Sequence, residues 1–242
     1  MALPILALTS AITYGVHVAA TPPVMVKSNE KAFSAEKPYL LLFCLRVLDI
    51  ASSMISIIEI LLLVTSSLAV HFPQSVFIIH LSDWLSTTLL MSPGQAISAP
   101  PMRIIAGLTV VAGSVIRWWC YKEMGRHFTF RVTVLKSHTL VTTGPYSIVR
   151  HPAYSGGTLI LLALPFWYAS QGSWIYESVI ARGSTPAAWF AVAATCATLG
   201  APVAWIPTRR AAEEDALMRK EFGKAWDEWA EKVPYKFIPG II

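Results

Sequence analysis

The chain has 242 residues, of which 55% are hydrophobic and only 14% are charged, and its formal net charge is +5. Soluble domains carry about 25% charged residues, so this composition argues against a soluble protein and for one whose surface faces lipid. The positive charge does not indicate a nucleic-acid-binding protein, because the basic residues form no aromatic-interleaved groove and no known reader motif.

Five apolar segments are long enough to cross a bilayer, which takes about 20 helical residues. They are residues 2–20, 39–70, 103–120, 153–170 and 186–206. The first lacks the basic start of a secretory signal, so we expect a retained transmembrane helix. A further apolar stretch, residues 75–91, is broken by His80 and Asp83. This stretch predicts a re-entrant or lumenal interfacial helix. Taken together, the segments predict an all-α integral membrane protein with about five transmembrane helices.

Lysine and arginine gather in three of the segments that connect or follow these spans. Residues 21–38, 117–150 and 207–242 hold all but three of the 19 basic side chains. With five spans, all three segments fall on one side of the membrane. The positive-inside rule places that side in the cytosol and the N-terminus in the lumen.

The second span contains ionisable side chains. Arg46 and Asp49 are three residues apart, so they share a helix face and can pair. Glu59 lies nearer the middle of the span, where a carboxylate indicates either a functional site or a buried structural hydrogen bond. The three cysteines are far apart and show no metal-ligand spacing, so we expect packing residues and no metal site.

A first polar cluster occupies residues 138–154, which run from a cytosolic loop into the fourth predicted span. A Gly-Pro pair marks a turn, and Pro152 takes an early helical position. Arg150, His151 and Tyr154 therefore lie at the cytosolic mouth of a span, where a helix N-terminus favours an anion.

A second polar cluster follows the fifth predicted span and includes Glu213 and Glu214. If the fourth and fifth spans are antiparallel neighbours, both clusters meet at one cytosolic level and form a pocket. Taken singly, each of these residues is more often an interfacial anchor, a structural histidine or part of a solvated helix face, whereas the combination favours a site. Apolar residues recur at helical spacing over residues 209–231, which predicts one amphipathic cytosolic helix.

These motifs resemble the isoprenylcysteine carboxyl methyltransferases. The matching runs are H-T-L-V-T-T-G-P-Y-S-I-V-R-H-P-A-Y, E-E-D-A-L and E-F-G-K-A-W-D-E-W-A-E-K-V-P-Y-K-F-I-P, within about residues 105–240. The R-H-P-x-Y element is shared by several membrane methyltransferase and reductase families, and the preceding H-x-L-V-T-x-G-x-Y makes the resemblance more specific. It divides the chain into an N-terminal transmembrane region, 1–100, and a catalytic region, 101–242.

The resemblance implies an enzyme of the endoplasmic reticulum membrane, with its catalytic side in the cytosol. It would transfer a methyl group from S-adenosylmethionine to the C-terminal carboxylate of a prenylated cysteine. Arg150 and Glu214 would lie near the reacting carboxylate. The residues expected to line the cofactor are His138, Leu140, Val141, Gly144, Tyr146, His151, Tyr154 and Glu213.

Three alternatives stay open. The C-terminal run also resembles membrane sterol reductases, which use NADPH but are larger and have more spans. Pro145 and the C-terminal run depart from the pattern of the family's animal members, so the acceptor can also be another lipid or a lipophilic carboxylic acid. A non-enzymatic membrane adaptor would bind no cofactor. A soluble Rossmann-type enzyme is unsupported, since no G-x-G-x-x-G motif occurs.

Overall fold

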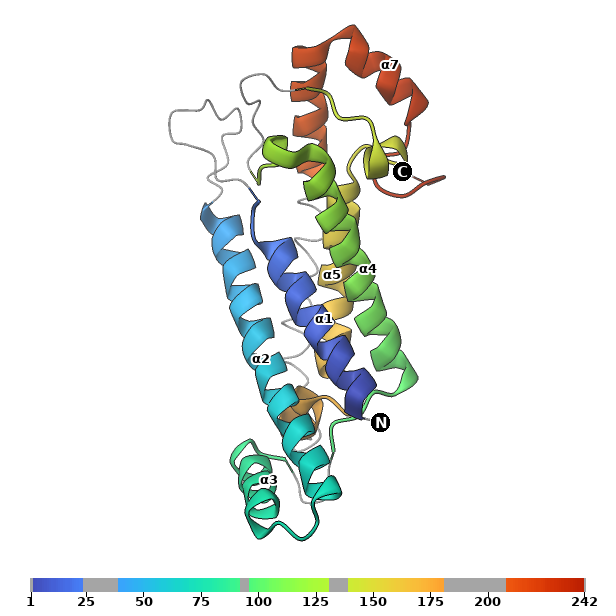
Figure 1. The fold of residues 1–242 in the computed structure, drawn as a ribbon. Coiled ribbons are helices and arrows are strands. Elements are labelled where there is room, and N and C mark those ends of the chain that lie inside the picture. Colours follow the sequence, from blue (N-terminus) through green and yellow to red (C-terminus); the bar gives the residue numbers. More distant parts are fainter. Residues whose placement is uncertain (1, 24–38, 92–95, 131–138, 181–207, 242) are drawn as a thin grey trace.

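The computed structural model describes residues 2–23, 39–91, 96–130, 139–180 and 208–241 (Figure 1). Within these ranges the regular structure is entirely helical, with no strand. The predicted all-α class is therefore confirmed for the part of the chain that the structure describes.

Among the described residues, four long helices form an elongated bundle (Figure 1). They are α1 (Ala2–Ala20), α2 (Tyr39–His71), α4 (Pro101–Met124) and α5 (Pro152–Ala169). Helix α4 packs against α5 and α1, and α1 packs against α2. Each helix begins and ends within a few residues of a predicted span.

Three of these helices, α1, α2 and α4, are long and apolar enough to cross a membrane. Helix α5 has 18 residues, starts with a polar and glycine-containing turn, and is not among those three. The fifth predicted span, residues 186–206, lies outside the described residues. A multi-spanning membrane protein is therefore supported, and the count of five spans stays a prediction.

Small residues bring the helices of the bundle close together. A Cβ on Gly113 of α4 would lie 2.6 Å from the carbonyl oxygen of Gly156 on α5, and the converse distance is also 2.6 Å. A Cβ on Gly15 of α1 would lie 2.6 Å from Ser114 Oγ on α4. Such contacts allow the backbone approach that is typical of packed membrane helices. The contact between Gly113 and Gly156 fixes the position of α5 along the axis of α4.

The outer face of the bundle is apolar. Large hydrophobic side chains of α2 such as Ile50, Met54 and Ile57 are more than half exposed. The interior is packed around Trp167 of α5 and Val110 of α4, both fully buried. Exposed apolar surface of this extent suits a lipid environment, because in water it would mark an interaction site.

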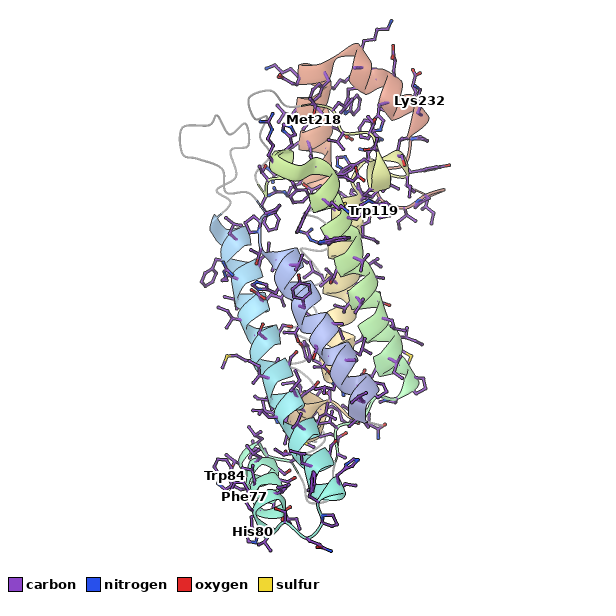
Figure 2. All side chains as sticks on the ribbon, viewed as in Figure 1. Phe77, His80, Trp84, Trp119, Met218 and Lys232 are labelled. Carbon is purple, nitrogen blue, oxygen red and sulfur yellow. The ribbon has the colours of Figure 1, made fainter. Side chains whose placement is uncertain are left out.

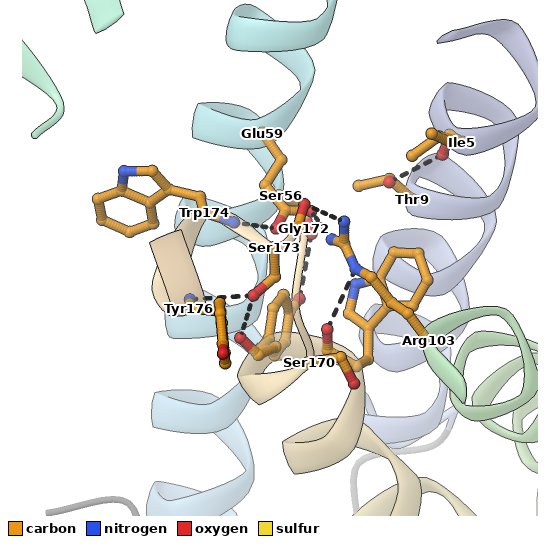
Figure 3. A network of polar contacts seen from close by, with 12 residues as sticks. Ile5, Thr9, Ser56, Glu59, Arg103, Ser170, Gly172, Ser173, Trp174 and Tyr176 are labelled. Carbon is orange, nitrogen blue, oxygen red and sulfur yellow. Dashed lines mark hydrogen bonds and ion pairs between the residues drawn. The ribbon is translucent and has the colours of Figure 1, made fainter. Parts of the chain in front are cut away.

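The charged residues of α2 are paired. Asp49 accepts contacts from Arg46 at 3.6 Å and from His17 Nδ1 at 3.0 Å, which confirms the predicted pairing of Arg46 with Asp49. Glu59 forms a 2.6 Å ion pair with Arg103 of α4, and neither side chain is exposed (Figure 3). The structure therefore supports the buried structural bond over the functional site for Glu59.

The two ends of the bundle differ. Helix α3 (Val76–Thr88) and the π-helical turn η3 (Tyr176–Ile180) lie toward one end, and α7 (Lys224–Lys232) lies at the other (Figure 1). The predicted helix within residues 75–91 is thus confirmed, while its relation to the membrane stays a prediction. The end of α4, the start of α5 and the C-terminal residues share the α7 end.

The C-terminal region corrects one prediction. A single helix over residues 209–231 is wrong, because residues 208–222 form one helix and α7 forms a second. Gly223 separates them with φ +53°, a left-handed conformation that glycine adopts at little cost. The chain turns there, so α7 folds back toward the end of the bundle.

Candidate functional site

The candidate site lies at the α7 end, where the start of α5, the helix of residues 208–222 and the C-terminal segment meet. The amide of Arg150 donates to the carbonyl of Tyr235 at 2.9 Å, and the amide of His151 donates to the carbonyl of Lys236 at 2.8 Å. Pro152 occupies the first turn of α5, as its fixed φ favours. These backbone bonds hold the C-terminal segment against the first turn of α5.

His151 lies between two carboxylates of the helix 208–222. Its Nε2 is 2.8 Å from Asp215 Oδ1, and its Nδ1 is 3.7 Å from Glu214 Oε2. Burial acts to raise the pKa of the Asp215 carboxyl, but the hydrogen bond and charge of His151 and the charges of Arg150 and Lys236 outweigh it, so this pKa lies below its usual range. An ionised carboxylate can only accept, so His151 Nε2 carries the proton.

Arg150 contacts both the helix 208–222 and the C-terminal segment. Its Nη1 lies 3.4 Å from Asp215 Oδ2, and its Nη2 donates to the carbonyl of Pro234 at 3.1 Å. The guanidinium lies 5.7 Å from the ring centroid of Trp226. Its Nε is buried and has no hydrogen-bond partner in the part of the chain that the structure describes. Buried donors without an acceptor are rare in folded proteins.

Tyr154 joins α5 to the helix 208–222. Its hydroxyl donates to Glu214 Oε2 at 3.2 Å and accepts from Arg210 Nε at 3.4 Å. Arg210 is buried, and its Nη2 donates to the carbonyl of Phe130 at 2.7 Å. Arg210 and Glu214 are four residues apart, so both point to the same side of their helix.

Gly144 begins the short 3₁₀ turn η2 (Gly144–Ser147), which precedes Arg150. Its φ is +58°, and a Cβ there would lie 2.6 Å from Glu123 Oε1. The same Glu123 carboxylate accepts a 3.0 Å hydrogen bond from Thr143 Oγ1. The backbone conformation therefore favours glycine, and a Cβ at this position would fit only if the Glu123 side chain moved.

Tyr146 lies in η2 with its ring in the aromatic cluster at the end of α4. Its hydroxyl donates to Met124 Sδ at 2.8 Å, and its carbonyl accepts from Trp229 Nε1 of α7 at 3.3 Å. Burial, followed by the charges of Cys120 and Glu214, raises the pKa of this hydroxyl well above its usual range. Tyr146 is therefore a neutral donor that packs η2 between α4 and α7.

The structure brings together some of the residues that the sequence singled out. Arg150, His151, Tyr154 and Glu214 form one cluster. Leu140 and Val141 are partly buried, and Val141 packs against the aromatic cluster beside Tyr146. The cofactor role of each stays a prediction.

One predicted cofactor residue that the structure describes, Glu213, does not join this cluster. Glu213 pairs instead with Arg209 at 3.1 Å, and both side chains are exposed. His138 lies outside the described residues.

Sequence reasoning missed two participants, Arg210 and Asp215. The spacing of Arg210 and Glu214 was a usable signal, because residues four apart share a helix face. Asp215 stands in the E-E-D-A-L run, but no local pattern connected it to His151. It contacts His151, which is 64 positions away in the chain, and no spacing rule connects positions that far apart.

Comparisons with known proteins agree with this region. Residues 105–182 match the isoprenylcysteine carboxyl methyltransferase family. The chain is 30% identical over 138 residues to protein-S-isoprenylcysteine O-methyltransferase B of Arabidopsis thaliana, and the match covers 53% of this chain and 55% of that protein. It is 29% identical over 132 residues to a probable protein-S-isoprenylcysteine O-methyltransferase of Oryza sativa subsp. indica, covering 51% of this chain and 54% of that protein.

The matched region thus spans about half the length of these curated relatives. The family match contains α5 and η2 and most of α4, which carry Arg150, His151 and Tyr154. The resemblance seen in the sequence is confirmed for residues 105–182, which are similar to the isoprenylcysteine carboxyl methyltransferase family.

Proposed function

We propose that this chain is a membrane methyltransferase that uses S-adenosylmethionine to methylate the C-terminal carboxylate of a prenylated cysteine at the cytosolic membrane face. The family match and the names of the curated relatives support the reaction class. The observation that carries the proposal is the buried Arg150 Nε, which has no acceptor among the described residues and belongs to the cluster of Glu214 and His151 at the end of an apolar bundle.

The acceptor needs no general base, since a carboxylic acid with a pKa of about 4 is already ionised at neutral pH. When bound, S-adenosylmethionine supplies an electrophilic methyl group on a positively charged sulfur. The residues of the chain have to bind, align and shield the reactants. Alignment alone can account for about 7–11 kcal/mol of such a barrier.

Arg150 is suited to hold the acceptor carboxylate. A guanidinium presents several donors in one plane, which matches the two oxygens of a carboxylate better than an ammonium does. Two of its nitrogens are held by Asp215 and Pro234, so the guanidinium is already oriented. The buried Nε–H is one donor that has no acceptor among the described residues.

Glu214 is suited to face a cationic cofactor. Its side chain is 29% exposed, and one of its oxygens accepts a hydrogen bond from Tyr154, which leaves lone pairs for a cationic ligand. His151 and Tyr154 would form the wall of the same site on α5. Leu140 and Val141 would add apolar surface for the uncharged part of the cofactor.

The position of the site suits two substrates of opposite solubility. Trp118 and Trp119, near the end of α4, are about half exposed, and Lys122 lies 5.5 Å from the Trp118 ring centroid. Exposed tryptophans with a neighbouring lysine are typical of a membrane–water interface. A prenyl chain would arrive through the lipid, and the cofactor would arrive from water at the same level.

The test uses purified protein in detergent with methyl-labelled S-adenosylmethionine and N-acetyl-S-farnesylcysteine. Two matched acceptors serve as controls: the carboxamide of the same compound, and an S-propyl analogue that lacks the prenyl chain. We expect base-labile methyl ester from the farnesylated acid alone. Arg150→Ala and Glu214→Ala should abolish its formation.

Binding of S-adenosylmethionine without transfer to this acceptor would keep the methyltransferase and assign it another lipid or small-molecule acceptor. A protein that neither binds S-adenosylmethionine nor transfers its methyl group would overturn the proposal. Binding of NADPH in the same protein would then favour a reductase.

A further inference from the structure

Asp215 connects three basic side chains at the candidate site. Its Oδ1 lies 2.8 Å from His151 Nε2, and its Oδ2 lies 3.4 Å from both Arg150 Nη1 and Lys236 Nζ. The Asp215 side chain is only 13% exposed. One carboxylate thus contacts the two consecutive residues that precede α5 and the C-terminal segment that covers them.

We propose that Asp215 is a positioning residue, which holds the His151 imidazole and the Arg150 guanidinium in the orientations that cofactor and acceptor require. The proposal rests on the function proposed above, because that function assigns His151 to the cofactor and Arg150 to the acceptor. Asp215 itself would touch neither substrate.

The first argument concerns the ring of His151. Because Asp215 can only accept, Nε2 is a donor, and Nδ1 is the nitrogen turned toward Glu214 at 3.7 Å. A carboxylate on one ring nitrogen sets both the tautomer and the orientation of an imidazole. An amide at position 215 could instead donate, and both the tautomer and the ring orientation would then be free to change.

The second argument concerns charge. Arg150 and Lys236 both approach Asp215 Oδ2, and His151 approaches the other oxygen. Loss of the carboxylate would leave Arg150 and Lys236 close together with no counter-ion at this position. Removing one member of a buried pair leaves the other without compensation. We therefore expect the Arg150 guanidinium to move away from its present position when Asp215 is neutral.

The third argument is that the C-terminal segment does not need the Asp215 side chain to stay in place. The C-terminal segment is already held by the backbone bonds of Arg150 with Tyr235 and of His151 with Lys236. Ser155 Oγ adds a 2.7 Å hydrogen bond to the carbonyl of Phe237. These bonds do not involve the Asp215 side chain. Its removal should therefore disturb the two functional side chains more than it disturbs the fold.

The kinetic test compares Asp215→Asn, Asp215→Glu and a control, Asp227→Asn. Asp227 also forms an ion pair at this end of the molecule, with Arg219 at 2.8 Å, but both partners are exposed. We expect Asp215→Asn to lower kcat/KM about 10²-fold, the size of loss that a small misplacement of aligned groups causes. Asp215→Glu should recover part of this loss, and Asp227→Asn should stay within about twofold of the wild type.

Activity is expressed per folded molecule, with the unfolding midpoint measured for each variant. A decrease in activity that only parallels the loss of folded protein would overturn the proposal. Equal activity of Asp215→Asn and the wild type would do the same.

A second measurement does not depend on methyl transfer. In protein labelled with ¹⁵N-histidine, His151→Gln identifies the His151 signals in the NMR spectrum. We expect a protonated Nε2 in the wild type and an altered protonation pattern in Asp215→Asn. Unchanged His151 signals would contradict the proposal. If the wild type neither binds cofactor nor transfers methyl, the proposed function fails, and these spectra still decide whether Asp215 holds the imidazole.

Discussion

Glu59 of α2 and Arg103 of α4 form a 2.6 Å ion pair in which neither side chain is exposed. The other oxygen of Glu59 accepts from the amide of Trp174 at 2.9 Å, and Arg103 Nη1 donates to the carbonyl of Gly172 at 2.8 Å (Figure 3). The pair therefore joins two helices to the turn that follows α5. The charges and hydrogen bonds of this pair are satisfied within the protein, whereas Arg150 Nε has no partner in the described part of the chain.

Arg103→Met should be strongly destabilising, because it leaves the Glu59 carboxylate buried without its partner. We expect a loss of about 3–5 kcal/mol in the free energy of unfolding. The double variant Glu59→Leu/Arg103→Met should regain most of this loss. Denaturant titration in detergent measures both, with the exposed Arg219→Met as a control that should cost at most about 1 kcal/mol. A double variant as unstable as the single one would contradict this account.

Gly144→Ala should destabilise more than Gly125→Ala. Both glycines have positive φ values, +58° and +51°, which L side chains rarely adopt, so an alanine strains the backbone at each. Only at Gly144 would the new Cβ meet Glu123, whereas nothing lies within 4 Å at Gly125. The difference between the two unfolding midpoints measures this clash, and equal midpoints would show that Glu123 moves aside without cost.

The free energy of unfolding at low pH should depend on Asp215. Its pKa in the folded protein is lowered, so its contribution is complete above the unfolded value of about 3.9 and is lost as the pH falls through the folded value. The wild type should therefore be more stable than Asp215→Asn at neutral pH, and the gap should close below about pH 4. Unfolding midpoints from pH 7 to pH 2 test this, and a gap that widens with acid would contradict it.

Arg150→Lys should not preserve activity although it preserves charge. A lysine cannot contact Asp215 and the carbonyl of Pro234 while it also offers a donor to an acceptor carboxylate. We expect kcat/KM for the farnesylated acid to decrease at least about tenfold, with smaller changes in cofactor affinity. Wild-type kinetics in this variant would remove Arg150 from acceptor binding.

The two ends of the bundle should lie on opposite sides of the membrane. His80 of α3 and Lys232 of α7 are at opposite ends of the molecule (Figure 2). In a variant without Cys44, Cys120 and Cys196, a single cysteine at position 232 should react with an impermeant thiol reagent in sealed microsomes. A cysteine at position 80 should react only after detergent is added, and labelling of both in intact vesicles would refute the predicted topology.

Local sequence patterns predicted α1 and α2 well, because the length of an apolar segment that crosses a bilayer follows from the thickness of the lipid. The predicted span 2–20 matches α1 (Ala2–Ala20), and the span 39–70 differs from α2 by one residue. Local patterns failed in the C-terminal region. The apolar spacing continues across Gly223, although the chain turns there, because side-chain periodicity carries no information about φ.

The sequence by itself determined that this is a helical protein with an apolar exterior, and that its motifs resemble a methyltransferase family. Composition, span length and short motifs are local properties, so they can be recognised without coordinates. Only the tertiary structure decided that Glu59 pairs with Arg103, that Glu213 points outward and that Asp215 meets His151. Those pairings depend on the rotation and height of each helix against its neighbours, which the packing of distant residues determines.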